Sequence, residues 1–104
     1  MNQSRLEKLK EFTRSNPTDS FSHYGLAMEY ANTGRHEQAL ETFQKLLAFN
    51  PDYTAAYYQA AVLLAKLERV EEARNHFRRG MELAKKQGDF HTLSEMEAAL
   101  NDLA

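Results

Sequence analysis

The sequence contains no cysteine, and only two prolines and four glycines occur among its 104 residues. The lack of cysteine excludes disulfides, thiolate metal sites and thiol catalysis. The scarcity of proline and glycine leaves few turn signals, which favours long helices over many short strands. No stretch approaches 18 apolar residues, and the first residues contain no apolar signal core. We therefore expect a soluble protein of the cytoplasm.

A strong excess of charge of one sign is also missing, because the formal net charge is -2 at pH 7. A chain with this balance has no overall attraction to nucleic acid or to an anionic membrane. Hydrophobic residues make up 42% and charged residues 27% of the sequence, which is typical of a globular protein. The length suits one compact domain.

Similar residues recur at a separation of 34 positions. Asn16-Pro17 and Asn50-Pro51 are 34 residues apart, and each pair closes a helical pattern. Four further pairs share this offset: Tyr24 with Tyr58, Ala27 with Ala61, Ala39 with Ala73, and Phe43 with Phe77. Chance rarely supplies so many matches at one offset, so the sequence contains an internal repeat.

Apolar residues spaced by three and four positions predict two helices in each repeat. The first is expected to end at Gly34, which adopts the left-handed conformation at little cost, and the second to begin near His36 and stop before Pro51. Asp52 is expected to cap the next helix. A final helix should start after Gly88, with Asp89 as its cap, and bury five apolar residues: Phe90, Leu93, Met96, Leu100 and Leu103.

The phase of the repeat divides the single domain into four segments. We expect a capping helix at residues 1–16, repeat one at 20–53, repeat two at 54–87 and a C-terminal capping helix at 88–104. The fold is then all-α, with about six antiparallel helices. A lone helix pair cannot bury both of its faces, so stacked neighbours must supply the core.

The spacing of large and small residues resembles that of the tetratricopeptide repeat (TPR) family. In the first unit the matching residues are His23, Leu26-Ala27, Tyr30, Ala39, Phe43 and Pro51, and in the second they are Tyr57, Ala60-Ala61, Leu64, Ala73 and Phe77. The resemblance covers essentially the whole chain, which is similar to small stand-alone bacterial TPR proteins. It implies a right-handed α-α superhelix, a TPR solenoid, and small residues where helices cross, at Ala27, Ala61 and Ser94.

Two residues depart from the family pattern. Glu68 stands where the family usually has a glycine that ends the helix, so the turn after it is less well specified. Gly80 lies inside a predicted helix, where glycine costs about 1 kcal/mol relative to alanine. A close approach by the final helix would explain this glycine.

The resemblance also implies that the first helices of successive units line a concave groove. A short peptide or helix of a partner protein would bind there, without catalysis. The candidate groove residues are Phe21, Tyr24, Met28, Asn32, Ala55, Tyr58, Val62, Lys66, His91 and Glu95. A tyrosine combines a large rigid surface with one polar end, which suits recognition. The expected ligand presents apolar anchors.

Other interpretations of this stripe remain open. Aromatic residues at helical spacing often belong to the core, and the groove could be filled by the chain's own terminus or by a second copy. A structural subunit that forms a homodimer through the groove is therefore the alternative function. The family subtype that grips chaperone carboxyl termini uses Lys, Arg and Asn, whereas Tyr24, Met28, Tyr58 and Val62 stand at the matching positions here.

No pattern of residues indicates an enzyme, a metal site or a cofactor. The four histidines fall on four predicted helices, and no two are spaced as helical metal ligands. No glycine-rich phosphate loop or nucleophile elbow occurs. The basic residues Arg74, Arg78 and Arg79 alternate with glutamates, which favours a salt-bridged outer face over an RNA-binding one. We expect a protein partner, and neither nucleic acid nor membrane.

Overall fold

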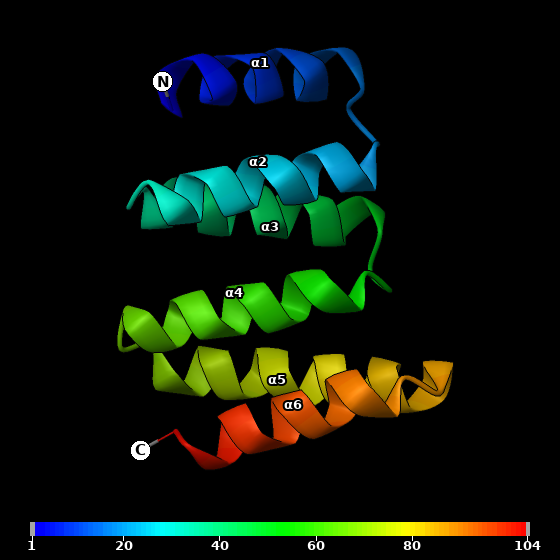
Figure 1. Cartoon of the computed structure of the whole chain (residues 1–104). Coiled ribbons are helices and arrows are strands. Elements are labelled where there is room, and N and C mark those ends of the chain that lie inside the picture. Colours follow the sequence, from blue (N-terminus) through cyan, green and yellow to red (C-terminus); the bar gives the residue numbers. More distant parts are fainter. Residues whose placement is uncertain (1, 104) are drawn as a thin grey trace. The chain divides into compact units, whose positions relative to one another are not determined.

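The computed structural model describes residues 2–103, with the side chains of residues 5–103. This part of the chain forms six α-helices and no strand. Figure 1 shows them coloured along the sequence from blue for α1 to red for α6. Their bounds are α1 (Asn2–Ser15), α2 (Ser20–Asn32), α3 (His36–Phe49), α4 (Thr54–Lys66), α5 (Val70–Gln87) and α6 (Phe90–Asn101). The expected all-α helical-repeat fold is confirmed.

The helices form two compact units, and the division falls between Pro51 and Asp52. In the first unit, α2 packs against α3 on one side and against α1 on the other. In the second unit, α4 packs against α5, which also packs against α6. Each unit therefore consists of a full helix pair and one additional helix.

Three turns that follow helices share one hydrogen-bonding arrangement. The N–H of Gly34 donates to the carbonyl of Ala31, and the next N–H donates to the carbonyl of Tyr30. The same pair of bonds recurs at Glu68 and at Gly88. All three residues have positive φ, at 79°, 61° and 74° respectively. Glu68 thus adopts the conformation that glycine adopts at the other two turns, at an energetic cost.

Each unit buries large apolar side chains between its helices. In the first unit, Phe43 and Leu46 of α3 are 1% and 0% exposed, beside the buried Ala27 of α2. In the second, Phe77 of α5 packs with Ala61 of α4 and Met96 of α6. Burial of a phenylalanine or methionine side chain contributes about 1.5–3 kcal/mol, so these contacts hold α3 on α2 and α6 on α5.

Gly80 of α5 lies against the side chain of Met96 of α6. A Cβ atom added at Gly80 would lie 2.7 Å from Sδ of Met96 and 3.2 Å from Cβ of Tyr57. No side chain fits in this space without displacing a neighbour. The expectation that the final helix explains this glycine is confirmed.

One of the two helix caps expected from the sequence is present, and a further cap was not predicted. Asp89 accepts a hydrogen bond from the N–H of Thr92 at 3.2 Å, as expected, and Asp19 caps α2 in the same way through Ser22 at 2.9 Å. The expected cap at Asp52 is wrong. Tyr53 occupies the cap position of α4, and no side chain caps that helix because it starts one residue later than the aspartate requires.

Two expectations for α6 are also wrong. Phe90 is 65% exposed rather than buried, and Ser94 is exposed rather than placed at a helix crossing. Met96 is the side chain of α6 that is fully buried. An α-helix turns by about 100° per residue, so Phe90 points about 120° away from Met96, and Ser94 about 160° away. Leu93 and Leu100 lie nearer to the buried direction and are half-buried, as is Leu103, which follows the helix.

Candidate functional site

The predicted groove residues of the first unit share one face of α2. Phe21, Tyr24, Met28 and Asn32 recur every three or four positions, which places them along a single stripe of the helix. Phe21 is 77% exposed, Asn32 is exposed, and Tyr24 and Met28 are half-buried. This stripe is accessible, and Phe21 is no part of the core.

The second unit repeats this arrangement on α4. Ala55, Tyr58, Val62 and Lys66 have the same spacing, with the two central residues half-buried and the two outer ones exposed. The apolar middle and the polar end of the stripe on α2 are therefore found again on α4.

The two tyrosines are held in the same way by the core. The ring of Tyr24 meets that of Phe43 at a centroid distance of 6.1 Å and an interplanar angle of 64°. Tyr58 meets Phe77 at 6.1 Å and 59°. Both phenylalanines are 1% exposed, so each tyrosine rests on a fixed support. A ring oriented in this way loses little conformational entropy when a ligand binds.

A hollow of about 390 Å³ lies beside the stripe on α4. Val62, Ala65 and Lys66 of α4 line one side of it, and Ala99 of α6 lines another. The remaining lining residues are Phe77, Asp102 and Leu103. The surface is mainly apolar, with one cation and one carboxylate at its edge. Two predicted groove residues, Val62 and Lys66, thus line a cavity.

The predicted residues of α6 lie apart from the lining of this hollow. His91 and Glu95 are both exposed, and Nε2 of His91 is 3.7 Å from Oε2 of Glu95. The two side chains are one helical turn apart and contact each other along the helix surface. The structure therefore brings Val62 and Lys66 to the hollow, and leaves His91 and Glu95 on the open surface of α6.

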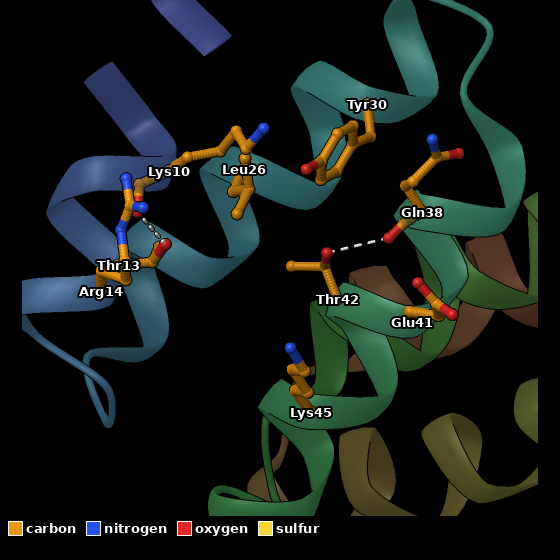
Figure 2. A pocket seen from close by; sticks show the side chains of 9 residues that line it. All are labelled: Lys10, Thr13, Arg14, Leu26, Tyr30, Gln38, Glu41, Thr42 and Lys45. Atoms are coloured by element: carbon orange, nitrogen blue, oxygen red, sulfur yellow. Dashed lines mark hydrogen bonds between the residues drawn. The ribbon is translucent and has the colours of Figure 1, made fainter. Parts of the chain in front are cut away.

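Figure 2 shows a second hollow, in the first unit, that the sequence did not lead us to expect. Its volume is about 240 Å³, and its lining comes from three helices: Lys10, Thr13 and Arg14 of α1, Leu26 and Tyr30 of α2, and Gln38, Glu41, Thr42 and Lys45 of α3. The two threonine hydroxyls donate to carbonyls of their own helices, at 2.9 Å and 2.8 Å. The sequence feature that could have indicated this hollow is a set of polar residues at helical spacing on α1 and α3.

The charges of this hollow are partly neutralised within α1. Arg14 pairs with Glu11 at 2.7 Å, and Lys10 lies 3.6 Å from Glu7. An adjoining hollow of about 550 Å³ shares Thr13, Arg14 and Lys45 with it. Exposed pairs of this kind contribute little to stability, so these side chains chiefly keep the surface polar.

Shifted pKa values in the described part of the chain have structural causes. Hydrogen bonds from Ser22 and from Thr92 lower the pKa of the capping residues Asp19 and Asp89. The Arg69 guanidinium lowers the pKa of Glu72. Within residues 2–103, no three His, Asp or Glu side chains are grouped so that they could hold a metal ion. None of the described helices is both long enough and apolar enough to cross a bilayer.

Paired antiparallel helices with alanines at their crossings define an all-α helical-repeat protein. The chain belongs to the tetratricopeptide repeat family, whose sequence profile matches residues 30–96.

Two curated relatives share sequence with the chain. A tetratricopeptide repeat and J domain-containing co-chaperone of Cryptococcus neoformans is 42% identical over 50 residues, which are 48% of this chain and 10% of the relative. An uncharacterized protein of Methanocaldococcus jannaschii is 41% identical over 63 residues, 61% of this chain and 73% of that protein. The chain thus spans only a tenth of the length of the fungal co-chaperone.

Solved structures share the fold. A tetratricopeptide repeat domain protein from Salinibacter ruber is 32% identical, with a TM-score of 0.79 over 84% of this chain and 88% of that one. The Yersinia enterocolitica type III secretion chaperone SycD, in complex with a peptide of the translocator YopD, is 16% identical, with a TM-score of 0.90 over 98% and 79% of the two chains. Another structure of SycD is described as an alternative dimer, with the same identity and TM-score over 98% and 78%.

Proposed function

We propose that this protein binds a short peptide or helix of a partner protein through two exposed stripes, one on α2 and one on α4. In this proposal the protein holds its ligand and performs no reaction on it. The observation that carries the proposal is the matched pair of half-buried tyrosines, Tyr24 and Tyr58. Each is half-buried, and its ring contacts that of a buried phenylalanine at an angle of about 60°.

The ligand that fits these stripes is mainly apolar. Phe21 is largely exposed, Met28 and Val62 are half-buried, and the hollow beside Val62 has an apolar lining with Lys66 at its edge. A peptide with two or three apolar side chains at helical or extended spacing can place them against these surfaces. The complex of SycD with a translocator peptide supports peptide binding as a use of this fold.

Recognition of a chaperone carboxyl terminus is a less suitable alternative. That mode needs cationic and amide side chains grouped around a carboxylate. Tyr24, Met28, Tyr58 and Val62 occupy the positions concerned, and they offer no cation. We expect an internal peptide segment rather than a free carboxyl terminus.

Selection from a displayed peptide library tests the proposal. Peptides enriched on the wild-type chain would be synthesised, and their affinities measured by fluorescence anisotropy. We expect them to carry apolar anchors and to lose at least about tenfold in affinity for the double variant Tyr24→Ala/Tyr58→Ala, because a buried aromatic contact of this kind is worth more than about 1.4 kcal/mol.

The matched control is Phe12→Ala, which removes an exposed aromatic ring from α1, outside the proposed binding surface. Circular dichroism would verify that all variants are folded. If the enriched peptides bound the tyrosine variant as tightly as the wild type, binding through these stripes would be refuted. If the tyrosine variant unfolded, the single variants Tyr24→Phe and Tyr58→Phe would test the polar ends of the same rings.

Self-association through the same stripes is the alternative function. The 77% exposure of Phe21 favours it, because a large exposed aromatic side chain is commonly covered by a partner. The alternative dimer described for SycD supports it as well. Sedimentation of the wild type and of Phe21→Asp separates peptide binding from self-association. If the chain self-associates through the stripes, the average mass in solution should be lower for the variant than for the wild type, whereas peptide binding alone requires no such difference.

A further inference from the structure

The exposed side of α1 carries apolar residues whose repeat equivalents are fully buried. Leu9 and Phe12 stand 34 positions before Phe43 and Leu46 of α3. Phe43 and Leu46 are 1% and 0% exposed, whereas Leu9 is half-buried and Phe12 is 52% exposed. In the first unit α2 covers these positions of α3 and packs on its other side against α1. In the repeat, α1 corresponds to α3, which is the second helix of a pair. By analogy with α2 on α3, the first helix of that pair would cover Phe12.

The opposite situation exists at α6. By the repeat, α6 corresponds to α2, and a hollow of about 440 Å³ opens beside it, lined by Arg78, Met81, Glu82, Lys85, Leu93 and Glu97. Arg78, Met81 and Glu82 stand 68 positions after Lys10, Thr13 and Arg14, which line the hollow of Figure 2. The two hollows are the same site of the repeat in two units.

The difference between these hollows is one helix. In the first unit, α3 closes the site with four side chains, Gln38, Glu41, Thr42 and Lys45. In the second unit the lining comes from α5 and α6 alone. Met81 and Leu93 take the positions that Thr13 and Leu26 have in the hollow of the first unit. The hollow of the second unit therefore has a more apolar lining. A helix of the type of α3 fits this place.

We propose that copies of this chain associate end to end, with α1 of one copy packed against α6 and the hollow at Met81 and Leu93 of the next. The contact completes one helix pair from two molecules. This surface is distinct from the tyrosine stripes proposed to bind peptides, and the interaction goes beyond that function.

The exposed phenylalanines of α1 and α6 both lie in this proposed contact. Phe90 is 65% exposed and stands 67 positions after His23, whose ring packs against Phe49 of α3 at 5.0 Å. The equivalent of Phe49 in α1 is Ser15, one helical turn beyond Phe12. A copy of α1 seated like α3 therefore places its Ser15 nearest to Phe90 and its Phe12 one helical turn away in the same contact, and we expect the contact to remove both rings from water.

The charges of the two helices are complementary. The sequence of α1 contains four cationic residues, Arg5, Lys8, Lys10 and Arg14, and two acidic ones. That of α6 contains Glu95 and Glu97 and neither lysine nor arginine. Helices of opposite net charge attract, whereas two copies of α1 or two copies of α6 repel each other. The α5 side of the hollow carries Arg78 and Lys85 as well as Glu82, so the attraction for α1 comes from α6, and there it favours the contact of unlike ends over a symmetric one.

A contact between unlike ends has a recognisable consequence for assembly. The two surfaces are different, so each bound copy still presents one unoccupied end of each kind, and the association does not stop at two molecules unless a ring closes. We expect the average mass to rise steadily with protein concentration.

Sedimentation velocity of the full chain, from about 10 µM to about 1 mM, tests the proposal in the concentration range of weak contacts. The variant Phe12→Asp blocks one end and Phe90→Asp blocks the other. Each alone should be monomeric, or at least about tenfold weaker in association. An equimolar mixture should form a one-to-one dimer and nothing larger, because a single native junction remains.

The control Phe21→Asp removes the third large exposed hydrophobic residue, on α2, and should associate as the wild type does. Circular dichroism checks folding, and Phe12→Ser replaces Phe12→Asp should the charge perturb α1. A wild type that stays monomeric at about 1 mM, single-end variants that associate normally, or a mixture that stays monomeric would each overturn the proposal. So would loss of association in Phe21→Asp, which would assign it to the groove.

Discussion

Gly80 of α5 lies against the side chain of Met96 of α6, so closely that an added Cβ would be 2.7 Å from Sδ and 2.9 Å from Cε of the methionine. Met96 is 0% exposed, so it has little room to move away. The missing side chain at Gly80 is thus what allows α6 to pack on α5 and cover Phe77.

Gly80→Ala should destabilise the protein, although alanine is the better helix former. The gain in helix propensity is about 1 kcal/mol, whereas overpacking of a filled core costs about 1–3 kcal/mol. We expect a net loss of about 1 kcal/mol and a drop in melting temperature of about 4–8 °C, measured by circular dichroism. An increase in melting temperature would show that α6 adapts without cost.

The variant Met96→Val provides the control for this close contact. Valine has neither Sδ nor Cε, so the atoms nearest to the added Cβ are removed. In this background Gly80→Ala should no longer destabilise, and the two substitutions should be coupled by about 1 kcal/mol in a double-mutant cycle. Additive effects would place the cause of the loss elsewhere, with Tyr57 the next nearest side chain.

Glu68→Gly should stabilise the turn between α4 and α5. Glu68 has φ of 61°, which a residue with a Cβ adopts at a cost of about 1–2 kcal/mol, and glycine lowers that cost while adding about 0.4–1 kcal/mol of unfolded-state entropy. We expect a net gain of about 0.5 kcal/mol in chemical denaturation.

The matched experiment is Gly34→Ala at the equivalent turn, where φ is 79° and no atom lies within 4 Å of an added Cβ. It should destabilise through the backbone alone. The prediction for Glu68 is contradicted if Glu68→Gly is as stable as the wild type while Gly34→Ala is less stable. The glutamate side chain would then contribute a stabilisation equal to the cost of its positive φ.

Stability should fall in acid through the helix caps. The pKa values of Asp19 and Asp89 are lowered by hydrogen bonds from Ser22 and Thr92, so both side chains favour folding when they are ionised. Their contribution is complete above the unfolded pKa of 3.8 and is lost as the pH falls through the lower folded values. Asp19→Asn/Asp89→Asn keeps both acceptors and should show a flatter decline below about pH 4. Parallel declines in thermal melts would contradict this.

The sequence allowed most of the fold to be predicted because its turn signals are local. Pro51, Gly34 and Gly88 mark ends that the structure confirms, and the repeat shows that Glu68 takes the place of a glycine. The explanation of Gly80 also came from the pattern, because an unfavourable residue inside a helix implies a close neighbour.

The predictions failed where packing between helices decides the outcome. Helical periodicity assigned Phe90 to the core, and the family spacing assigned Ser94 to a helix crossing. The orientation of α6 instead follows from Met96 against Gly80. The start of α4 at Thr54 leaves Asp52 one residue too early to cap it. The hollow of Figure 2 depends on how far apart α1 and α3 lie, which no local pattern specifies.

The central claim is that the stripes on α2 and α4 bind the partner. Amide chemical shifts of the ¹⁵N-labelled chain, recorded during titration with a library-selected peptide, test it most directly. The account predicts that the largest changes occur around Phe21, Tyr24 and Met28 and around Tyr58 and Val62. Changes confined to α1, α3 and α5, with these residues unmoved, would contradict it.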